Sequence, residues 1–318
     1  MRSEKTKKFL EVNGLSSRYY SSNGPVYAVD NVDFSLNENE SIGIAGESAC
    51  GKSTLGLSII RMLSGGKTFG KITFQGESIL DVPESEFDEY FRWKKISMIF
   101  QGAMSSLDPV FTINEQFIEI LNQHDFDGDL IQTIHDAIIS VGLNLHVLKK
   151  YPHELSGGMK QRAIIAMALL LKPKFVIADE PTTALDVLIQ AQIMNLLKNL
   201  KKKGMSFMLI THDLAVLSEI ADKIGIMYGG QMVEFGSSEE IYHNPKHPYT
   251  QGLLESIPTL KGNSPRYIKG NPPSLFDVPT QCQFIERCPL VMDKCSQLPP
   301  KFKTATGYTR CWLYDDTS

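Results

Sequence analysis

The segment of residues 46–54 has the composition and spacing of a loop that binds the phosphates of a nucleotide. It follows the pattern Gly-x4-Gly-Lys-Ser, whose glycines allow the backbone to curl and point its N–H groups at phosphate oxygens. The helix expected to follow adds the partial positive charge of its N-terminus. We expect Lys52 to reach the β- and γ-phosphates and the Ser53 hydroxyl to bind Mg²⁺. The expected nucleotide contacts here are Gly46, Glu47, Ser48, Ala49, Cys50, Gly51, Lys52, Ser53 and Thr54.

Two adjacent carboxylates, Asp179 and Glu180, follow the apolar run of residues 175–178. This run predicts a buried strand, and ligands of a parallel sheet bind at the carboxyl ends of its strands. We expect Asp179 to hold Mg²⁺, directly or through water, and Glu180 to accept a proton from the attacking water or to orient it. An exposed acidic strand end is the alternative, and it does not explain why residues 181–186 (Pro-Thr-Thr-Ala-Leu-Asp) follow so closely.

A third segment, residues 155–162, has the sequence Leu-Ser-Gly-Gly-Met-Lys-Gln-Arg. We expect Ser156, Gly157 and Gly158 to lie at the N-terminus of a helix that continues through Arg162. Because the first N–H groups of a helix have no partner within it, such an end attracts anions. The segment therefore predicts an anion-binding site.

The elements around these motifs predict an α/β protein. Strand and helix patterns alternate after residue 171, which predicts a mainly parallel sheet with covering helices. Residues 114–171 show a helical pattern and form an insertion within that fold. The strands are expected at residues 29–36, 41–45, 71–74, 175–178 and 208–211, and the helices that flank the motifs at 52–63, 188–200 and 214–221.

Composition limits the classes of protein to which the chain can belong. With 318 residues, 42% hydrophobic and 21% charged, the chain reads as a globular protein with one large domain and a smaller piece. A net charge of -4 gives no support to nucleic-acid binding. No apolar run approaches the roughly 20 residues of a membrane span, and the N-terminus does not resemble a secretory signal. We expect a cytosolic protein whose membrane role comes through partners.

Four of the five cysteines lie close together near the C-terminus, in a region rich in Pro and Gly. Their spacing, Cys-x5-Cys-x6-Cys-x15-Cys, lacks the Cys-x2-Cys pairs of the usual zinc sites. A reducing compartment disfavours disulfides, whereas four thiolates can hold an iron–sulfur cluster or zinc. The four candidate metal ligands are Cys282, Cys288, Cys295 and Cys311.

In their order along the chain, the three phosphate-related motifs resemble those of the ATP-binding subunit of ABC ATPases, whose nucleotide sites are shared between two subunits. The resemblance implies a P-loop nucleotide-binding domain over residues 1–242, with an antiparallel β subdomain and a helical subdomain at about residues 102–170. It also implies further site residues. These are Gln101 near Mg²⁺, Asp186 at the subunit contact, His212 at the γ-phosphate, and Tyr19, with Tyr20 as alternative, stacked on adenine.

The resemblance assigns Ser156 and the two following glycines to the γ-phosphate of ATP held by a partner subunit. Two subunits then close head to tail around ATP, and hydrolysis lets their interface open. Two residues depart from the common pattern of the phosphate loop. Ala49 replaces a frequent glycine and is tolerated if its φ is negative. Cys50 lies beside Lys52 and a helix start, which predicts a lowered thiol pKa and a reactive cysteine.

Residues 244–250 and 282–289 resemble the C-terminal region of dipeptide/oligopeptide (peptide/nickel) transporter ATPase subunits, and residues 243–318 are assigned to this region. Members of that subfamily can bind a four-iron–four-sulfur (4Fe-4S) cluster at the four cysteines. Zinc and unliganded buried thiols stay open as alternatives. The cluster would act as a structural staple in a region with little core.

The resemblance implies the ATP-hydrolysing motor of an ABC importer at the cytoplasmic face of the membrane. The implied partners are two transmembrane permease subunits, a paralogous ATPase subunit and, indirectly, an external solute-binding protein. Peptide is the first choice of cargo, with nickel and oligosaccharides as alternatives. An ABC ATPase that acts on DNA, RNA or ribosomes is disfavoured because no tandem ATPase unit, long coiled coil or basic region is visible. A regulatory module without catalysis is disfavoured because Lys52, Glu180 and Ser156 are intact.

Overall fold

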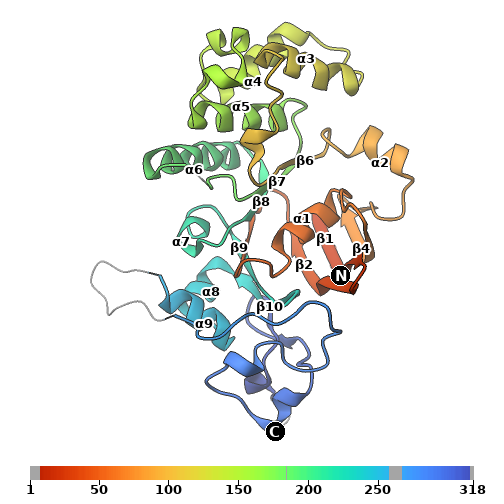
Figure 1. The fold of residues 1–318 in the computed structure, drawn as a ribbon, viewed down its shortest axis with the longest axis vertical. Coiled ribbons are helices and arrows are strands. Elements are labelled where there is room, and N and C mark those ends of the chain that lie inside the picture. Colours follow the sequence, from red (N-terminus) through yellow and green to blue (C-terminus); the bar gives the residue numbers. More distant parts are fainter. Residues whose placement is uncertain (1–7, 184, 258–266, 316–318) are drawn as a thin grey trace, which may run out of the picture. The chain divides into compact units, whose positions relative to one another are not determined.

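The computed structural model describes residues 8–183, 185–257 and 267–315, and the chain divides into two compact units (Figure 1). The first unit combines Met1–Asp81 with Leu209–Ser318, and the second unit is Val82–Met208. The boundary falls within β8 (Ser206–Ile210), through which the chain passes from the second unit back into the first.

The first unit contains an antiparallel sheet with the strand order β2-β1-β4-β5. The long strands β1 and β2 pair from Leu10 opposite Leu36 to Ser21 opposite Gly24. Apolar residues alternate with polar ones at the start of β1, which buries one face of the strand. The strands are β1 (Leu10–Ser21), β2 (Gly24–Leu36), β4 (Gly66–Phe74) and β5 (Glu77–Ser78).

A second sheet of the first unit has the order β11-β12-β10-β9-β3. Its strands β3 and β9 are parallel, and β9 and β10 form an antiparallel pair. All four residues of β3 are buried, as expected of a strand with neighbours on both faces. The strands are β3 (Ile42–Ala45), β9 (Lys223–Tyr228), β10 (Gln231–Ser237), β11 (Phe302–Lys303) and β12 (Tyr308–Thr309).

Two helices of the first unit are shorter than the sequence pattern predicts. The helix that follows the phosphate loop ends before Arg61, whose φ of 58° is incompatible with a right-handed helix. The helix that begins at Leu214 continues only as turns after Leu217. The α-helices are α1 (Lys52–Ile59), α7 (Leu214–Leu217), α8 (Ser238–His243) and α9 (Pro248–Glu255), with 3-10 turns at Ile285–Arg287, Asp293–Ser296 and Trp312–Tyr314.

The second unit joins a parallel strand pair, β6 (Ile96–Ile99) and β7 (Phe175–Asp179), to the predicted block of helices. The four longer helices all begin at a polar side chain that accepts a hydrogen bond from a backbone N–H of the first turn, which stabilises each start. The helices, with caps in parentheses, are α2 (Glu84–Tyr90), α3 (Ile113–Gln123; Thr112), α4 (Leu130–Ser140; Asp129), α5 (Gly157–Leu169; Ser156) and α6 (Val187–Lys202; Asp186). Shorter 3-10 turns occupy Ala103–Ser105, Leu145–Lys149 and Pro152–Glu154.

Parallel strand pairs in both units agree with the predicted α/β class. The compact units reflect spatial contacts, whereas the predicted domains of residues 1–242 and 243–318 reflect motif content, so that division stays a prediction. Within the part of the chain that the structure describes, no helix is both long enough and apolar enough to cross a membrane.

Candidate nucleotide-binding site

The phosphate loop of residues 46–54 connects β3 to α1 within the first unit. Gly46 and Gly51 adopt φ angles of 150° and 101°, which strain any residue with a side chain. A Cβ added to Gly46 would overlap the carbonyl oxygen of Met227, and one added to Gly51 would overlap that of Ala28. Only glycine therefore fits at these two positions of the loop.

Lys52 is the first residue of α1, and its side chain is buried. Its Nζ turns back into the loop and donates hydrogen bonds to the carbonyl oxygens of Gly46 at 2.8 Å and Glu47 at 2.7 Å. A buried cation therefore lies inside a curl of backbone at a helix N-terminus, where a phosphate is stabilised.

Tyr19 lies on β1 with its hydroxyl 3.4 Å from the Oγ1 of Thr54. The structure thus brings our candidate for adenine stacking to the end of the phosphate loop. Tyr20, the alternative, is next in the strand and is 56% exposed. Since successive side chains of a strand point to opposite faces, the two tyrosines cannot share this position. The geometry favours Tyr19, and its contact with adenine stays a prediction.

Two residues of the loop differ from what the sequence analysis considered. Ala49 has a φ of 61°, in the left-handed region, so the condition of a negative φ is not met. An alanine there costs roughly 1–2 kcal/mol. Cys50 is buried, and burial raises the pKa of its thiol despite the nearby charge of Lys52. The prediction of an activated thiol neglected this desolvation, which disfavours the charged thiolate.

The adjacent carboxylates lie at the end of β7 in the second unit, and the first of them, Asp179, is buried. Glu180 has a φ of 46°, a strained conformation that costs about 1–3 kcal/mol and is frequent at functional sites. Its Oε2 accepts hydrogen bonds from Gln101 Nε2 at 3.0 Å and from Thr183 Oγ1 at 2.8 Å. The structure therefore brings two predicted site residues together and adds Thr183, which the sequence analysis missed.

Ser156 caps α5, where its Oγ accepts a hydrogen bond from Met159 N, and it is exposed. A Cβ added to Gly158 would come within 2.9 Å of Ile189 Cγ2, so this glycine allows α5 to pack closely on α6. At Gly157, by contrast, the nearest atoms to an added Cβ would lie 3.6 and 3.7 Å away, at ordinary contact distance. Nothing in the described chain requires Gly157 to lack a side chain.

Asp186 caps α6, and its Oδ1 accepts a hydrogen bond from Ile189 N at 3.0 Å. The next two residues, Val187 and Leu188, are 81% and 69% exposed. Exposed apolar side chains beside a capping carboxylate form a candidate contact surface for another chain. The predicted role of Asp186 at a subunit contact is not tested by these observations. Ala184, in the same segment, lies outside the described residues.

His212 follows β8 in the first unit and is exposed. The backbone on either side of it is fixed. Thr211 N donates to Ile44 O of β3 at 3.1 Å, and Asp213 caps α7 by accepting from Ala215 N at 2.8 Å. An imidazole on a fixed backbone beside β3 is compatible with its predicted contact to a phosphate.

The four late cysteines lie near one another in the C-terminal part of the first unit. The thiols of Cys282, Cys288 and Cys295 all act electrostatically on Cys311, and Cys282 N donates to Cys295 O at 3.0 Å. Burial raises the pKa of Cys282 to about 11 and that of Cys311 to about 12. None of these cysteines forms a disulfide.

The arrangement of these thiols does not support the predicted metal site. Across residues 8–183, 185–257 and 267–315, no three His, Cys, Asp or Glu side chains are placed to hold one metal ion. The Cys288 sulfur accepts a hydrogen bond from Leu290 N at 3.4 Å, within its own loop.

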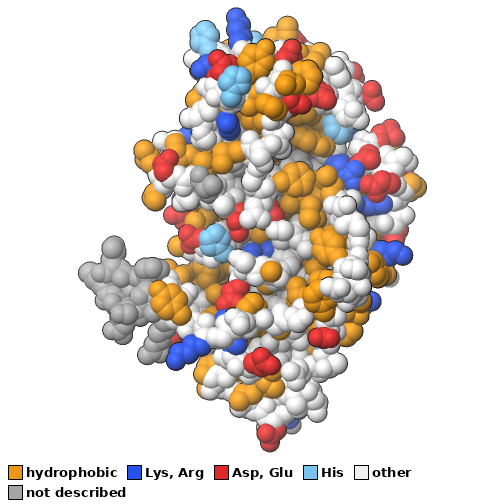
Figure 2. Space-filling model, in the orientation of Figure 1, with side chains coloured by type: hydrophobic (Ala, Val, Ile, Leu, Met, Phe, Trp, Pro, Cys, Tyr) orange, Lys and Arg blue, Asp and Glu red, His pale blue; other side chains and the backbone are white. Residues whose placement is uncertain are grey.

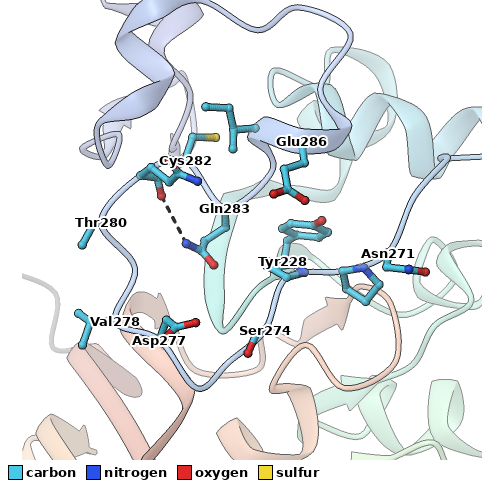
Figure 3. A pocket seen from close by; sticks show the side chains of 13 residues that line it. Tyr228, Asn271, Ser274, Asp277, Val278, Thr280, Cys282, Gln283 and Glu286 are labelled. Carbon is cyan, nitrogen blue, oxygen red and sulfur yellow. Dashed lines mark hydrogen bonds between the residues drawn. The ribbon is translucent and has the colours of Figure 1, made fainter.

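A cavity of about 450 Å³ lies beside the cysteines (Figure 3). It is lined by Tyr228 and by residues between 271 and 286, and by none of the predicted nucleotide contacts. Gln283 and Glu286 line it next to Cys282, and Gln283 Nε2 donates to Gln281 O at 3.4 Å. The cavity belongs to the C-terminal region.

Figure 2 shows how the charged side chains are distributed over one face of the molecule. On the face shown in Figure 2, Lys and Arg side chains are interspersed with Asp and Glu rather than gathered in one basic patch. The net charge of -4 agrees with this distribution.

Two protein families match consecutive parts of the chain. The profile of the ABC transporter family matches residues 29–183, and that of the oligopeptide/dipeptide transporter C-terminal region matches residues 233–295. The first match includes the phosphate loop, the Ser156 segment and both adjacent carboxylates, and the second includes three of the four late cysteines.

Curated relatives match nearly the whole chain. The oligopeptide transport ATP-binding protein AppD of Bacillus subtilis (strain 168) is 43% identical over 96% of this chain and 97% of its own length. The oligopeptide transport ATP-binding protein OppD of Escherichia coli (strain K12) is 41% identical over 95% and 91%. The dipeptide transport ATP-binding protein DppD of Bacillus subtilis (strain 168) is 40% identical over 97% and 96%.

Solved structures confirm the predicted fold class. The dimeric ATP-binding cassette MJ0796 bound to ADP and Pi matches 72% of this chain and 98% of its own, with a TM-score of 0.64 and 26% identity. The structure of cbiO1 from Clostridium perfringens matches 75% of this chain and 92% of its own, with a TM-score of 0.64 and 25% identity.

Proposed function

Because the chain belongs to the family of oligopeptide and dipeptide transport ATP-binding proteins of ABC transporters, we propose that it hydrolyses ATP to drive the uptake of peptides through partner membrane permeases. One observation carries this proposal. The complete set of nucleotide motifs occurs in one chain with the transporter-type C-terminal region, and the relatives match this chain over nearly their whole length. The chain is accordingly an ATPase. Peptides are the proposed cargo because the relatives are oligopeptide and dipeptide transport proteins.

In the first unit, the proposed role of the loop is to bind the triphosphate. Lys52 would exchange its hydrogen bonds to the Gly46 and Glu47 carbonyls for phosphate oxygens, since its ammonium already faces the inside of the loop. Ser53 would bind Mg²⁺, His212 would contact the γ-phosphate, and Tyr19 would stack on adenine. The curl that Gly46 and Gly51 allow supports the first of these roles.

In the second unit, Glu180 is the proposed base that accepts a proton from the attacking water or orients it. Its hydrogen bonds from Gln101 and Thr183 hold the carboxylate in one place, and its strained backbone supports a functional role. Asp179 and Gln101 are proposed to hold Mg²⁺. When bound, this ion neutralises charge that develops on the phosphoryl oxygens.

The site is proposed to be completed by a second ATPase subunit. Ser156 and Gly157 are exposed at a capped helix N-terminus, and a Cβ added to Gly157 would meet Leu185 and Met104 only at ordinary contact distance. Asp186, Val187 and Leu188 offer an exposed surface for the same contact. A paralogous ATPase subunit in a head-to-tail dimer would place the anion site of each subunit on the other's γ-phosphate.

The membrane partners are proposed to be two permease subunits supplied by an external solute-binding protein, with the chain peripheral at the cytoplasmic face of the membrane. Val110 and Phe111, which lie between Gln101 and α3, are 70% and 46% exposed and are candidates for the permease contact. Exposed apolar side chains that follow Gln101 closely in the sequence would let the permeases sense the state of the nucleotide.

For the late cysteines we keep the 4Fe-4S cluster as a proposal and zinc as its alternative. The hydrogen bond from Leu290 N to the Cys288 sulfur supports a cluster, because such bonds stabilise cluster-ligating thiolates. At least two of the four thiols would have to turn from their present positions for all four to share one metal centre. Iron and acid-labile sulfide in the anaerobically purified chain, with visible absorbance, would support the cluster, and zinc or no metal would reject it.

The test of the catalytic proposal is Glu180→Gln, because the amide keeps the shape of the carboxylate but cannot accept the proton. We expect turnover to fall about hundredfold or more while ATP affinity stays within about twofold. Glu119→Gln, at an exposed glutamate of α3 in the same unit, is the matched control and should retain wild-type turnover. Equal turnover in the Glu180 variant would reject its role.

The test of the cargo is the ligand that remains in the external binding protein when the assembled complex is pulled down with this chain. Mass spectrometry should identify short peptides. Nickel or an oligosaccharide in their place would overturn peptide uptake and leave the ATPase assignment intact.

A further inference from the structure

Glu47, in the phosphate loop, is held by the C-terminal region of the same unit. Its carboxylate accepts two parallel hydrogen bonds from Arg287, from Nη1 at 2.7 Å and from Nη2 at 2.8 Å. Its backbone N–H donates to the hydroxyl of Tyr249 at 2.9 Å, and its carbonyl oxygen accepts from Lys52. Every polar group of this loop residue therefore has a defined partner, and two of the partners lie about 200 residues or more away in sequence.

The Arg287 guanidinium is saturated and nearly inaccessible, since its side chain is only 5% exposed. Besides the two bonds to Glu47, Nη1 donates to the hydroxyl of Tyr228 at 3.1 Å. Nη2 donates to Ile268 O at 3.2 Å, and Nε donates to Lys269 O at 2.9 Å. A guanidinium has five N–H donors, and here all five have acceptors. A charged side chain placed in this way can take one orientation only.

A buried cluster of three aromatic rings positions the two groups that bind Glu47, the Tyr249 hydroxyl and the Arg287 guanidinium. Tyr228 ends β9, Tyr249 lies in α9, and Phe284 precedes the 3-10 turn that carries Arg287. Their ring centroids lie 4.5 Å apart for the two tyrosines, 5.2 Å for Tyr228 and Phe284, and 5.4 Å for Tyr249 and Phe284. All three rings are buried, so the Tyr249 hydroxyl and the Arg287 side chain start from a rigid base.

We propose that Arg287 is a positioning residue of the nucleotide site, which fixes Glu47 and, through it, the loop that receives the phosphates. The inference rests on the proposed ATPase function and adds to it a residue outside the nucleotide motifs. The same Glu47 carbonyl that accepts from Lys52 belongs to the residue that Arg287 holds, so loss of the ion pair frees the loop beside the lysine. Arg287 directly precedes Cys288, one of the four late cysteines.

The experiment compares ATP affinity and steady-state kinetics of the full-length chain with those of Arg287→Met. Loss of two charged hydrogen bonds should weaken binding of a fluorescent ATP analogue, and raise KM for ATP, by about tenfold. The turnover number should change by less than about twofold, because Arg287 contacts none of the proposed catalytic groups. Arg287→Lys should recover only part of the affinity, since an ammonium cannot make the bidentate contact.

Lys294→Met is the matched control, because Lys294 also forms an ion pair in the C-terminal region, with Asp315 at 2.9 Å, and has no contact with the loop. It should leave KM unchanged. Melting temperatures of both variants show whether the region stays folded. A rise in KM that is equal in the two variants would mean that Arg287 acts only through general stability, and would overturn the proposal.

A double-mutant cycle isolates the link to Glu47. If Arg287 acts through Glu47, adding Arg287→Met to Glu47→Gln should raise KM by less than about twofold beyond the Glu47 variant alone. Independent, multiplying effects would overturn the proposal. Wild-type protein that binds no ATP would overturn the proposed function as well, whereas wild-type binding with an unaffected Arg287→Met variant would reject only the positioning role.

Discussion

The phosphate loop of residues 46–54 and the segment of residues 156–158 both present glycines at a helix N-terminus, but these glycines have different neighbours. In the loop, a Cβ on Gly46 or Gly51 would overlap carbonyl oxygens of the same unit. At Gly157, an added Cβ would meet only Leu185 and Met104 at ordinary contact distances. Packing within the chain therefore excludes a side chain at Gly46 and Gly51, whereas it leaves room for a methyl group at Gly157.

The two candidate anion sites differ in how much of each site the chain itself supports. The loop is held from within the unit by Ala28, Met227 and the Arg287 ion pair, so it keeps its shape by itself. The exposed Ser156 segment has a capped helix start and no such supports on its outer side. Packing within the chain does not require a glycine at position 157. This fits the proposal that a ligand held by another chain approaches Gly157. The substitutions below act on one segment at a time.

The largest effect is expected from Gly51→Ala, which acts on the loop. Its Cβ would overlap the carbonyl oxygen of Ala28 at a φ of 101°, so the backbone must move. We expect a loss of about 3 kcal/mol of unfolding free energy and no measurable ATP binding. Gly65→Ala is the matched control, because Gly65 also has a positive φ of 68° but open space around it. It should cost about 1 kcal/mol and leave ATP affinity unchanged, as measured by denaturant titration and nucleotide binding.

The next effect is expected from Gly157→Ala, which acts on the open segment. Alanine fits the chain and favours the helix, so the unfolding free energy should stay equal or rise by a few tenths of a kcal/mol. The added methyl group would stand where we propose the partner's γ-phosphate. ATP turnover of the assembled dimer should therefore fall about hundredfold, while ATP binding to the separate subunit is unaffected.

Gly158→Ala is the comparison for this prediction. Its Cβ would come within 2.9 Å of Ile189 Cγ2, so it should be less stable than Gly157→Ala by about 1 kcal/mol. Full turnover in Gly157→Ala would show that the lack of a side chain at Gly157 has no function. The difference between the two segments would then say nothing about a partner subunit.

The sequence predicts those features of the two segments that depend only on neighbouring residues. The pattern Gly-x4-Gly-Lys-Ser and the strand before it indicate the curled loop because its glycine requirements arise within a few residues. The cap at Ser156 is predicted for the same reason. The hydrogen bond between Gln101 and Glu180 joins two predicted residues, but the backbone strain at Glu180 has no sequence signal in a single chain.

The parts that could not be predicted depend on burial and on distant contacts. The pKa of Cys50 rises because the surrounding fold desolvates the thiol, and its local neighbours suggest the opposite. The ion pair between Glu47 and Arg287 spans 240 residues. In the sequence analysis, Arg287 appears only within residues 282–289, which resemble the C-terminal region of transporter ATPase subunits. The metal prediction itself rested on residue type and spacing, which do not determine where thiols point.

The smallest expected effect concerns α9, the helix that carries the Tyr249 hydroxyl to the phosphate loop. It is a change in the free energy of unfolding with pH. His247 caps α9 and packs on Phe284, with centroids 5.8 Å apart. Burial lowers its pKa to about 3, so the folded chain keeps it neutral. The unfolded chain binds a proton near pH 6.5, and this histidine therefore favours folding fully above that pH and progressively less below it. At pH 5 the loss is roughly 2 kcal/mol. The nearby buried Glu234, whose pKa burial raises, offsets part of it because the folded chain protonates it more readily as pH falls.

His247→Asn separates these two contributions. Asparagine can still accept the hydrogen bond that Tyr249 N donates at 3.1 Å to the imidazole Nδ1, but it does not titrate, and Glu234 is unchanged. Between pH 7.5 and pH 5, the free energy of unfolding should therefore fall less in the variant than in the wild type. This holds even if the two proteins differ in stability at pH 7.5. Amide exchange in α9 should follow the same order, because this helix carries the Tyr249 hydroxyl to Glu47. An equal drop in both proteins would mean that the imidazole is protonated without loss of packing, and the loop would then be supported less rigidly than its buried neighbours indicate.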